Sequence, residues 1–445
     1  MKNDMIETKQ HFAVKDRVER YSEHTWLSTA RDNARSQFAK LGLPSTHDED
    51  WRFTNVAPLK KFAFQPAPQP VRHGVTAEML NQFPFTSLGG NKLVFVDGLF
   101  APELSSITKV PNGVKLLSLA DALATETELV KKHLFRHANV EKNFFTALNT
   151  AHCQDGGFIY LPPNAEVEGP IHLLFVSTGN TNGATTHPRN LVIAERGSHF
   201  CILESYVSLG DASYFTNSVT ELVVGENASG QHLKFQNENQ QAFHIGNLAT
   251  HFGRASNVTT HSFALGARLS RTNIHATLAG EGLECILNGL YLTRGEQLAD
   301  HHMIVEHAQP HCASHEYFNG ILAEKSKGVF HGRIFVHPNA QKTDAKQTNK
   351  NLLLSDDATV NTKPQLEIYA DDVKCTHGAT IGQLNDEAIF YLRARGIPLE
   401  KARRILVHAF AGEIIDRVGC ASVREELDRL VWNRLEENHE VAMDS

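Results

Sequence analysis

The chain opens with a helical pattern of apolar residues. Apolar positions recur every four residues from Trp26 to Phe38, a spacing that places them on one face of a helix. This pattern favours helical structure from about residue 22 to residue 62. The stretch "QPAPQP", which ends at Pro70, predicts a Pro-rich linker. Residues 1–70 are therefore expected to form an N-terminal helical region followed by a linker.

Residues 71–155 mix two patterns. The stretch "KLVFVDGLF" predicts strands around an Asp-Gly turn. Further along, "ELVKKHLFRHANVEKNFFTALNTAH" has helical spacing and predicts a helix that ends near His152. This segment is expected to be a mixed α/β lead-in to the region that follows.

Residues 156–382 predict mainly β structure. Short apolar runs alternate with turn-forming stretches such as "RGS", "GENAS", "GEG", "HPNA", "SDDA" and "ADDV", and no helical pattern interrupts them over roughly two hundred residues. A sandwich, a barrel and a parallel β-solenoid all fit this texture. The irregular run lengths favour the solenoid, although no strict repeat is visible. The apolar runs lie at 191–194, 201–203, 222–224, 286–292, 329–336 and 366–369.

Helical spacing returns in residues 383–445. Asn385 or Asp386 is the candidate N-cap of a first helix, and Gly396 is its candidate end. A second helix restarts within "IPLEKARRILVHAFAGEIIDRV", where proline opens the pattern. A third is expected to begin at Ser422, because Glu425 would complete a capping box. The chain therefore ends in a small helical domain.

Charge and composition argue against several classes of partner. The chain has 445 residues and a formal net charge of -7, with no run of Lys or Arg, which argues against a nucleic-acid-binding surface. No stretch of about 18 apolar residues occurs, and the N-terminus has no apolar signal segment, so we expect no membrane span and a cytoplasmic location. The cysteines form no C-x-x-C pair, which indicates neither a disulfide framework nor a self-contained metal motif. The six cysteines are Cys153, Cys201, Cys285, Cys312, Cys375 and Cys420.

Cys375 and His377 are the main candidate ligands. Residues two apart on a strand point to the same face, so both side chains would lie beside Val373, whereas Lys374 and Thr376 would point away. Thiolate and imidazole are both ligands that transition metals accept. The pattern equally fits two residues at the edge of a core, since a buried cysteine commonly acts as a small apolar side chain.

The stretch "ADHHMIVEH" offers a second group of candidate ligands. On a strand, His301 and His307 would share one face, and His302 and Glu306 the other. Four ligands would then not converge, so a structural role in stacking solenoid rungs is favoured. The nearby "HCASH" stretch contains further candidate ligands, because a loop around Pro310 could bring His311, Cys312 and His315 together.

Two other features have a functional and a structural interpretation. Trp51 in "DEDWRFTN" is interpreted as an anchor between domains rather than as a binding aromatic. The acid pairs Asp356–Asp357 and Asp371–Asp372 would suit a β-helix enzyme that cleaves polysaccharides with paired carboxylates. Both pairs stand where Asp normally forms turns, and neighbours on a strand face opposite ways, so we interpret them as turn residues.

Several longer stretches resemble one known family. They are "DEDWRFTNVAPL", "FTALNTAH" followed by "GGFIYLPPNAEVEGPIHLLF", "ADHHMIVEH", "GVFHGRIFV" and "PQLEIYADDVKCTHGATIGQLNDEAIFYLRARGI". Together they are similar to the SufB/SufD family, the scaffold subunits of the Suf iron–sulfur cluster assembly machinery. The resemblance runs from about Asp48 to Ile415. The stretch "ADDVKCTHGAT" resembles the SufD version rather than that of the paralogue SufB.

The resemblance implies a fold and a set of partners. It implies a right-handed parallel β-helix core between helical N- and C-terminal regions, which pairs through the β-helix end with SufB. It also implies that the C-terminal helices bind the ATPase SufC, and a homodimer of the isolated chain is compatible with it. The candidate contact residues for SufC are Ile405, Leu406, Phe410 and Ile414.

The resemblance also implies a role for Cys375 and His377. In SufD relatives the histidine that matches His377 is implicated in cluster assembly, and the cysteine that matches Cys375 has been considered as a ligand. The cluster would be transient, would lie at the interface with the partner and would not be held by the isolated chain. Reduced flavin in the assembled complex is also compatible with the family.

Three hypotheses from different classes follow. The leading one is a non-catalytic scaffold of an iron–sulfur assembly complex, with a SufB-like paralogue that carries the cluster as its nearest variant. The second is a polysaccharide-acting β-helix enzyme, which predicts a signal peptide and a groove lined with acids and aromatics. The third is an independent metal-binding protein that uses its 25 histidines. The spacing of those histidines disfavours the third.

Overall fold

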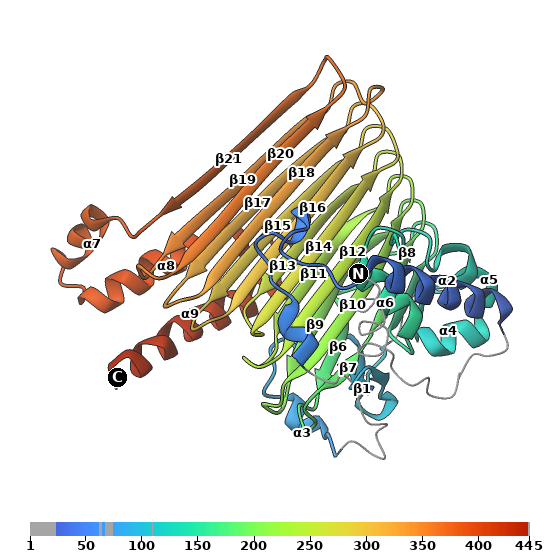
Figure 1. Ribbon diagram of the computed structural model, residues 1–445, viewed down its shortest axis with the longest axis horizontal. Helices are drawn as coiled ribbons and strands as arrows, with labels where there is room; N and C mark the ends of the chain where they lie inside the picture. The colour runs from blue at the N-terminus through green and yellow to red at the C-terminus, as the bar shows by residue number, and fades with distance from the viewer. Residues whose placement is uncertain (1–23, 62–64, 67–73, 109, 444–445) are drawn as a thin grey trace.

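The core of the protein is a parallel β-solenoid. The computed structural model describes residues 24–61, 65–66, 74–108 and 110–443, so the N-terminal 23 residues and part of the predicted Pro-rich linker lie outside the described residues. Two long sheets face each other across a shared core and form about 8 turns of solenoid (Figure 1). This confirms the predicted mainly β core flanked by helices, and excludes the sandwich and the barrel.

Each turn of the solenoid contributes one strand to each sheet. Neighbouring strands pair in parallel from β5 to β20 in sheet A and from β2 to β21 in sheet B, with β3 added antiparallel to β2 and β4 antiparallel to β5. The main path of sheet A comprises β4 (Lys115–Ser118), β5 (Gly157–Leu161), β8 (Arg189–Ala194), β10 (Tyr214–Val224), β12 (Phe243–Phe252), β14 (Leu269–Leu278), β16 (Leu298–His307), β18 (Lys327–Val336) and β20 (Thr359–Ile368), with β1 (Gln65–Pro66) and β7 (Ala184–Thr186) beside it. Sheet B comprises β3 (Leu99–Phe100), β2 (Asn91–Val96), β6 (Ile171–Ser177), β9 (His199–Ser208), β11 (Ser229–Asn237), β13 (Asn257–Ala264), β15 (Glu284–Thr293), β17 (Ala313–Leu322), β19 (Asp344–Leu353) and β21 (Lys374–Gly382).

The turns from sheet A to sheet B share one left-handed backbone position. Each stacked turn bonds to the next, as where the Asn227 amide donates to the Arg254 carbonyl and the Ala255 amide to the Glu281 carbonyl. The shared position has a positive φ and is filled by Gly197, Asn227, Ala255, Gly282, His311 and Lys342. The stacked hydrogen bonds hold even non-glycine residues in this region, which they otherwise rarely adopt. The structural repeat is therefore regular although the sequence repeat is not.

The helices differ in detail from the sequence pattern. They are α2 (Thr25–Leu41), α3 (Ala77–Leu80), α4 (Leu119–Thr125), α5 (Thr127–His133), α6 (Phe144–His152), α7 (Asp386–Arg393), α8 (Leu399–Ile415) and α9 (Ala421–Met443), with short 3-10 helices at Glu49–Trp51, Ala57–Lys61 and Pro102–Leu104. In the region predicted to be helical from about 22 to 62, the described residues 24–61 form α2 and two short 3-10 helices. The third C-terminal helix starts one residue before the predicted Ser422.

The prediction of one helix up to His152 was wrong. Helices α5 and α6 are separate because the buried carboxylate of Glu221 accepts hydrogen bonds from the amides of Phe135, His137 and Ala138, in a segment where Phe135 has a φ of 63°. The chain re-enters a helix at Asn143, whose side chain caps α6. In contrast, the predicted N-cap at Asn385 is confirmed by its bond to the Ala388 amide.

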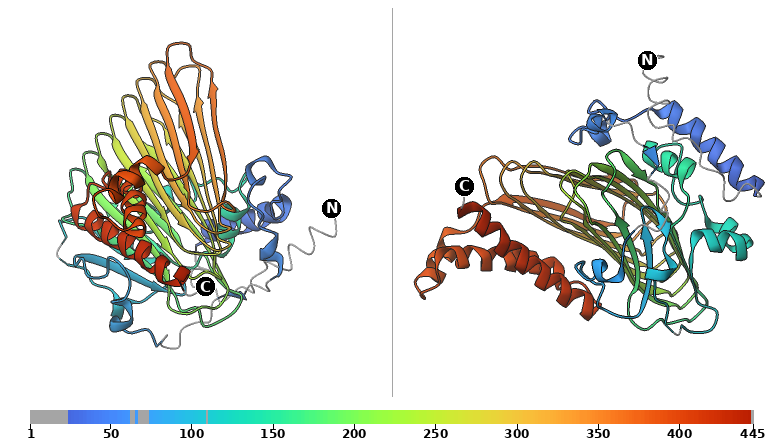
Figure 2. Two further views of the ribbon diagram at one scale, coloured as in Figure 1. Left: turned by 90° about the vertical axis from the view of Figure 1, so that its left-hand side faces the viewer. Right: turned by 90° about the horizontal axis from the view of Figure 1, so that it is seen from below.

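The two helical regions cover opposite outer faces of the solenoid. Figure 2 shows the N-terminal helices on one side and the C-terminal helices on the other. Phe145 of α6 packs with Phe215 and Phe243 on the outside of sheet A. Val407 and Ile415 of α8 belong to the apolar cluster on the outside of sheet B. None of the described helices combines the length and apolarity that a bilayer crossing requires.

Candidate functional site

The last turn of the solenoid leaves two strand edges unpaired. Among the described strands, β20 pairs only with β18 and β21 only with β19, and both lie at the outermost edge in Figure 1. Ile368 and Ile381 are 37% and 49% exposed, although the register aligns them with Val336 and Asn351, which point into the solenoid and are buried. Inward-facing apolar side chains are thus exposed because no further turn covers them. The interior of the solenoid is therefore exposed at this end.

Cys375 and His377 lie on this open end. They pair in register with the buried Ala345 and Gln347 of β19, so both side chains are on the inward face of β21. This confirms that the two share a strand face. Cys375 is half-buried, against the same apolar cluster as Val373, whereas His377 is exposed. The imidazole is therefore accessible to a partner, and the thiol is partly covered.

The surroundings of Cys375 favour the protonated thiol. Burial, together with the charge of Asp344, raises the pKa of Cys375 above its ordinary value. A metal ion at this thiol would have to displace the proton against that environment. His377 is the better placed of the two ligands in the isolated chain.

A row of polar side chains leads inward from His377. On successive strands of sheet B, the register aligns His377 with Gln347 and Gln347 with Glu316. The Gln347 amide donates to the Glu316 carboxyl at 3.2 Å, and both side chains are buried. Burial raises the pKa of Glu316 to about 8, so this carboxyl is neutral at pH 7. The solenoid interior next to the open end therefore contains a row of polar side chains and is not purely apolar.

Further inside, the solenoid holds buried ionisable groups around a small polar cavity. Glu204 accepts a hydrogen bond from Thr220 at 2.7 Å and lies 2.9 Å from His232. The Lys234 ammonium lies 3.3 Å from the Thr272 hydroxyl, and burial lowers its pKa to about 8. These side chains line the cavity. Such groups are seldom buried without partners, and here Glu204 contacts His232, whereas Lys234 contacts a neutral hydroxyl and the Tyr206 ring.

The C-terminal helices expose a different set of residues from the predicted one. Ile414 is only 2% exposed and packs in the core between α8 and sheet B, so its assignment to a docking face is corrected. Phe410 is half-buried against the same cluster, and Ile405 and Leu406 are half-buried. Among the side chains of the C-terminal helices whose burial is described, the large exposed apolar residues are instead on α7, which has no buried residue. They are Phe390 and Tyr391, at 74% and 57% exposure.

The histidines of "ADHHMIVEH" alternate between faces as predicted. His301 and His307 point inward, where His301 lies 3.0 Å from the Ser262 hydroxyl and His307 lies 2.8 Å from that of Ser314. These two support the structural interpretation. His302 points outward and is covered by the N-terminal segment, a contact that the local sequence did not indicate.

The other candidates have structural contacts. Trp51 stacks 3.7 Å from the Arg271 guanidinium carbon and 5.3 Å from the Phe145 ring, which confirms an anchor between the N-terminal region and the solenoid. Both acid pairs lie in the turns that flank β20, so they are turn residues. In the "HCASH" stretch, the thiol of Cys312 contacts the carbonyl oxygens of Gly280 and Pro310.

The sequence alone did not indicate which residues the strand register between successive turns brings together. Glu316, Gln347 and His377 are 31 and 30 residues apart, which is one turn of the solenoid each. The only available signal was this spacing, and it becomes visible once the strand boundaries are known. The exposed pair on α7 could have been found from its position on the polar face of a helix.

Comparison with known proteins agrees with this architecture. The family described as "SUF system FeS cluster assembly, SufBD core domain" matches residues 175–410, and the family "SufBD protein N-terminal region" matches residues 6–173. An iron–sulfur cluster assembly SufBD family protein of Synechocystis is 35% identical over 92% of this chain and 91% of its own length. The iron–sulfur cluster assembly protein SufD of Escherichia coli is 30% identical over 93% of this chain and 94% of its own length. Protein ABCI7 of Arabidopsis thaliana chloroplasts is 31% identical over 90% and 84%. With both family regions matched and relatives aligned over nearly their whole length, the chain belongs to the SufBD family of iron–sulfur cluster assembly proteins.

Proposed function

We propose that this chain is a non-catalytic scaffold subunit of a cytoplasmic Suf iron–sulfur assembly complex. In this proposal it pairs through the open end of its solenoid with the homologous subunit SufB and binds the ATPase SufC through its C-terminal helices. The observation that carries the proposal is the unpaired last turn, with its exposed inward-facing Ile368 and Ile381. Free strand edges of this length are normally protected or paired. A homologous solenoid end supplies matching strands, which explains why this end is left open.

The open end also suits the handling of a cluster by two chains. His377 offers an accessible imidazole, and Cys375 a neighbouring thiol on the same face. A cluster usually needs four ligands, so two residues of this chain would provide part of the set and the partner the rest. The iron–sulfur cluster is cargo in this arrangement. Its ligands meet only when the two subunits pair.

The energy for assembly would come from another subunit. The sequence contains no G-x-x-x-x-G-K-[ST] phosphate-binding loop, so ATP hydrolysis is assigned to the partner. Phe390 and Tyr391 provide an aromatic surface on α7, and aromatic residues are enriched at protein interfaces. We therefore extend the docking surface from the predicted Ile405, Leu406 and Phe410 to this aromatic pair.

Pairing with SufB is tested by introducing a charged side chain on the inward face of the last solenoid turn. Ile381→Lys should abolish co-purification with SufB, because a lysine would be desolvated at the joined ends. Thr380→Lys is the matched control, since the adjacent residue points outward on the same strand. Both variants should keep the wild-type circular dichroism spectrum. Equal capture of SufB by Ile381→Lys and wild type would refute pairing through this end.

ATPase docking is tested on α7. The double variant Phe390→Asp, Tyr391→Asp should lose SufC in a pull-down while it retains SufB. Met79→Asp, which charges an exposed apolar residue on α3, should keep both partners. Retention of SufC by the double variant would move the docking surface away from α7.

A further inference from the structure

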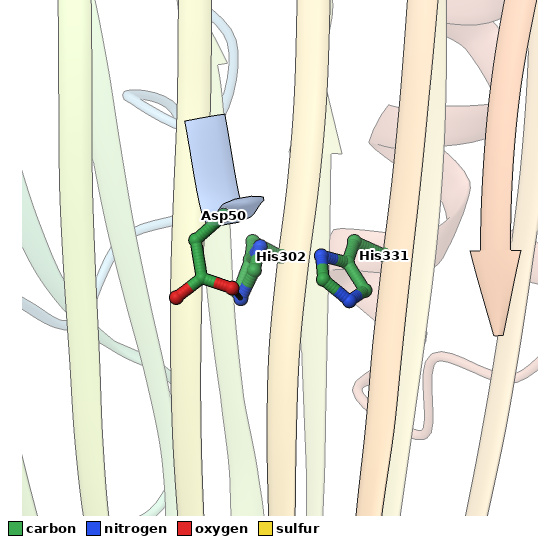
Figure 3. A group of neighbouring side chains, drawn as sticks. All are labelled: Asp50, His302 and His331. Carbon is green, nitrogen blue, oxygen red and sulfur yellow. Dashed lines mark ion pairs between the residues drawn. The ribbon is translucent and has the colours of Figure 1, made fainter. Parts of the chain in front are cut away.

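Three potential metal ligands converge on the outside of the solenoid. Among the described residues, Asp50, His302 and His331 each have one ligand atom within 4.8 Å of the others (Figure 3). The two histidines come from outward positions on the adjacent strands β16 and β18, and their ring centroids are 4.3 Å apart. Asp50 comes from the segment of residues 43–61, here called the N-terminal strap, which crosses this face. The group lies outside the solenoid and is separate from the inward-facing His377.

The strap is held in place by contacts other than the three ligands. Trp51 stacks on Arg271, and the Arg271 guanidinium donates to the Asp50 carbonyl oxygen at 2.7 Å. The Thr54 hydroxyl donates to the buried Asp300 carboxylate at 2.5 Å. These contacts fix the backbone of Asp50 above the two strands. Its carboxylate is therefore presented to the histidines without any ion.

The His302 imidazole lacks ordinary hydrogen bonds. It is only 5% exposed, its Nδ1 atom has no hydrogen-bond partner among the residues that the structure describes, and its Nε2 atom lies 3.7 Å from Asp50 Oδ1, which is too long for a hydrogen bond. Burying an imidazole in this way is unfavourable. Burial also holds the pKa of His302 well below its ordinary value, so the ring is neutral and carries a lone pair. A separation of 3.7 Å is close to that of two ligands that share one ion at about 2.0–2.2 Å each.

The second histidine is oriented as metal-bound histidines usually are. His331 Nε2 lies 2.6 Å from Gln365 Oε1, and because a carbonyl oxygen only accepts, this nitrogen donates its proton. The Nδ1 atom of His331 is then the one with a free lone pair. An outer hydrogen bond of this kind fixes the tautomer and orientation of a histidine ligand.

The local charges permit a bound cation. Arg333 contacts Asp50 at 3.2 Å and Glu367 at 3.5 Å, so it keeps a carboxylate partner if Asp50 turns to an ion. Lys363 is paired with Glu49 at 2.6 Å. Arg271 is paired with Asp300 at 2.7 Å. The three cations are thus neutralised by carboxylates, with Asp50 available to the ion.

We propose that Asp50, His302 and His331 bind one divalent first-row transition metal ion, which clamps the N-terminal strap to β16 and β18. Two imidazole nitrogens and one carboxylate oxygen form a donor set that suits Zn²⁺ and Fe²⁺, and it leaves coordination positions for water. The ion satisfies the lone pair of the buried His302. It joins Asp50 and His302, which are 252 positions apart in the chain, and so ties the N-terminal region to the two turns that precede the last one.

The test is a titration of the metal-free full chain with Co²⁺, followed by competition with Zn²⁺. Wild type should bind one equivalent of Co²⁺ with a visible absorption band that Zn²⁺ abolishes. Asp50→Asn and His331→Gln should each weaken this binding at least about tenfold. His199→Gln, which alters an exposed histidine on sheet B, should bind as wild type does. Zn²⁺ should also slow tryptic cleavage after the exposed Arg52 in wild type and not in the two ligand variants.

The variants are chosen so that a loss of folding is not mistaken for a loss of metal binding. Asp50 is exposed, so Asp50→Asn should leave the core folded, and His331→Gln retains a donor for Gln365. Native circular dichroism spectra with lost Co²⁺ binding in Asp50→Asn would support the site. Co²⁺ affinity and absorption that are unchanged in Asp50→Asn would overturn it. Since no SufB or SufC is present in this assay, its failure would leave the proposed scaffold function untouched.

Discussion

The Arg189 guanidinium lies 2.6 Å from the Glu221 carboxylate, and neither side chain has any exposed surface. Arg189 is the first residue of β8, and Glu221 of β10 also accepts hydrogen bonds from the backbone amides between α5 and α6. Arg189 in turn donates to Thr150 of α6 at 3.1 Å. The pair therefore joins the N-terminal helices to the β core, and its loss should affect both.

Glu221→Gln should lower the free energy of unfolding by about 3–5 kcal/mol, because it leaves the Arg189 charge buried without an anion. Urea unfolding followed by circular dichroism measures this change. Glu226→Gln is the control, since Glu226 forms an exposed pair with Arg254 and its loss should cost less than about 1 kcal/mol. Similar decreases in the free energy of unfolding in the two variants would show that the buried ion pair stabilises the protein no more than the exposed pair does.

Glu316 should make stability depend on pH. Burial raises its pKa to about 8 in the folded protein, against an ordinary value of 4.5. Between these two values the folded state holds a proton that the unfolded state releases, so the contribution of Glu316 to stability falls as the pH rises through this window. Relative to wild type, Glu316→Gln should gain about 2 kcal/mol between pH 6 and pH 8.

This difference is measured by urea unfolding of both proteins at the two pH values. Other titrating groups cancel in the comparison, because they are present in both proteins. Glu284→Gln, a substitution at a half-buried position of β15, should follow wild type at both pH values. A constant difference between Glu316→Gln and wild type across this range would mean that Glu316 is ionised in the folded protein.

Cys420 should be the most reactive cysteine at mildly acidic pH. A hydrogen bond from the Cys201 thiol, assisted by Ser422, lowers the pKa of Cys420 to about 5. The same contact raises the pKa of Cys201. Iodoacetamide should therefore modify Cys420 at nearly the same rate from pH 6 to pH 8, whereas the modification of Cys375, whose pKa is raised, should accelerate about tenfold per pH unit.

Peptide mass spectrometry after timed labelling separates these sites. Cys201→Ala should slow the labelling of Cys420 at pH 6, because the donor that stabilises its thiolate is removed. Ser314→Ala, a change in the solenoid interior, should leave the rate unaltered. A tenfold rise per pH unit at Cys420 in wild type would contradict the lowered pKa.

Strands were predictable from the sequence, and their stacking was not. The apolar runs 191–194, 286–292 and 329–336 each fall within one observed strand, because a strand needs only local side-chain preference. The turns that set the stacking accept glycine, asparagine, alanine, histidine and lysine at one left-handed position. The position is defined by hydrogen bonds to the next turn, so no single residue type marks it.

The candidate site, like the fold, was predictable only where a local sequence pattern determines it. The shared face of Cys375 and His377 follows from the two-residue period of a strand, and the structure confirms it. The burial of Ile414 could not be read from α8 alone, since an apolar stripe fits a partner and the solenoid equally well. Asp50 meets His302 only because the strap crosses β16, which is a tertiary contact without a local signal.

The last prediction concerns the ligands at the open end, and it rests on the proposed function. His377→Ala should leave the fold and the pairing with SufB intact, because the side chain is exposed on the last strand. It should lower the iron and sulfide content of the purified complex about tenfold, as expected when a ligand is lost. Cys375→Ala should have a smaller effect, since burial and the charge of Asp344 raise the pKa of this thiol and make it a poorer ligand. Thr376→Ala, between the two on the opposite face, should assemble clusters as wild type does. A wild-type cluster yield from the His377→Ala complex would remove His377 from the ligand set and leave it as an ordinary residue at the edge of the solenoid.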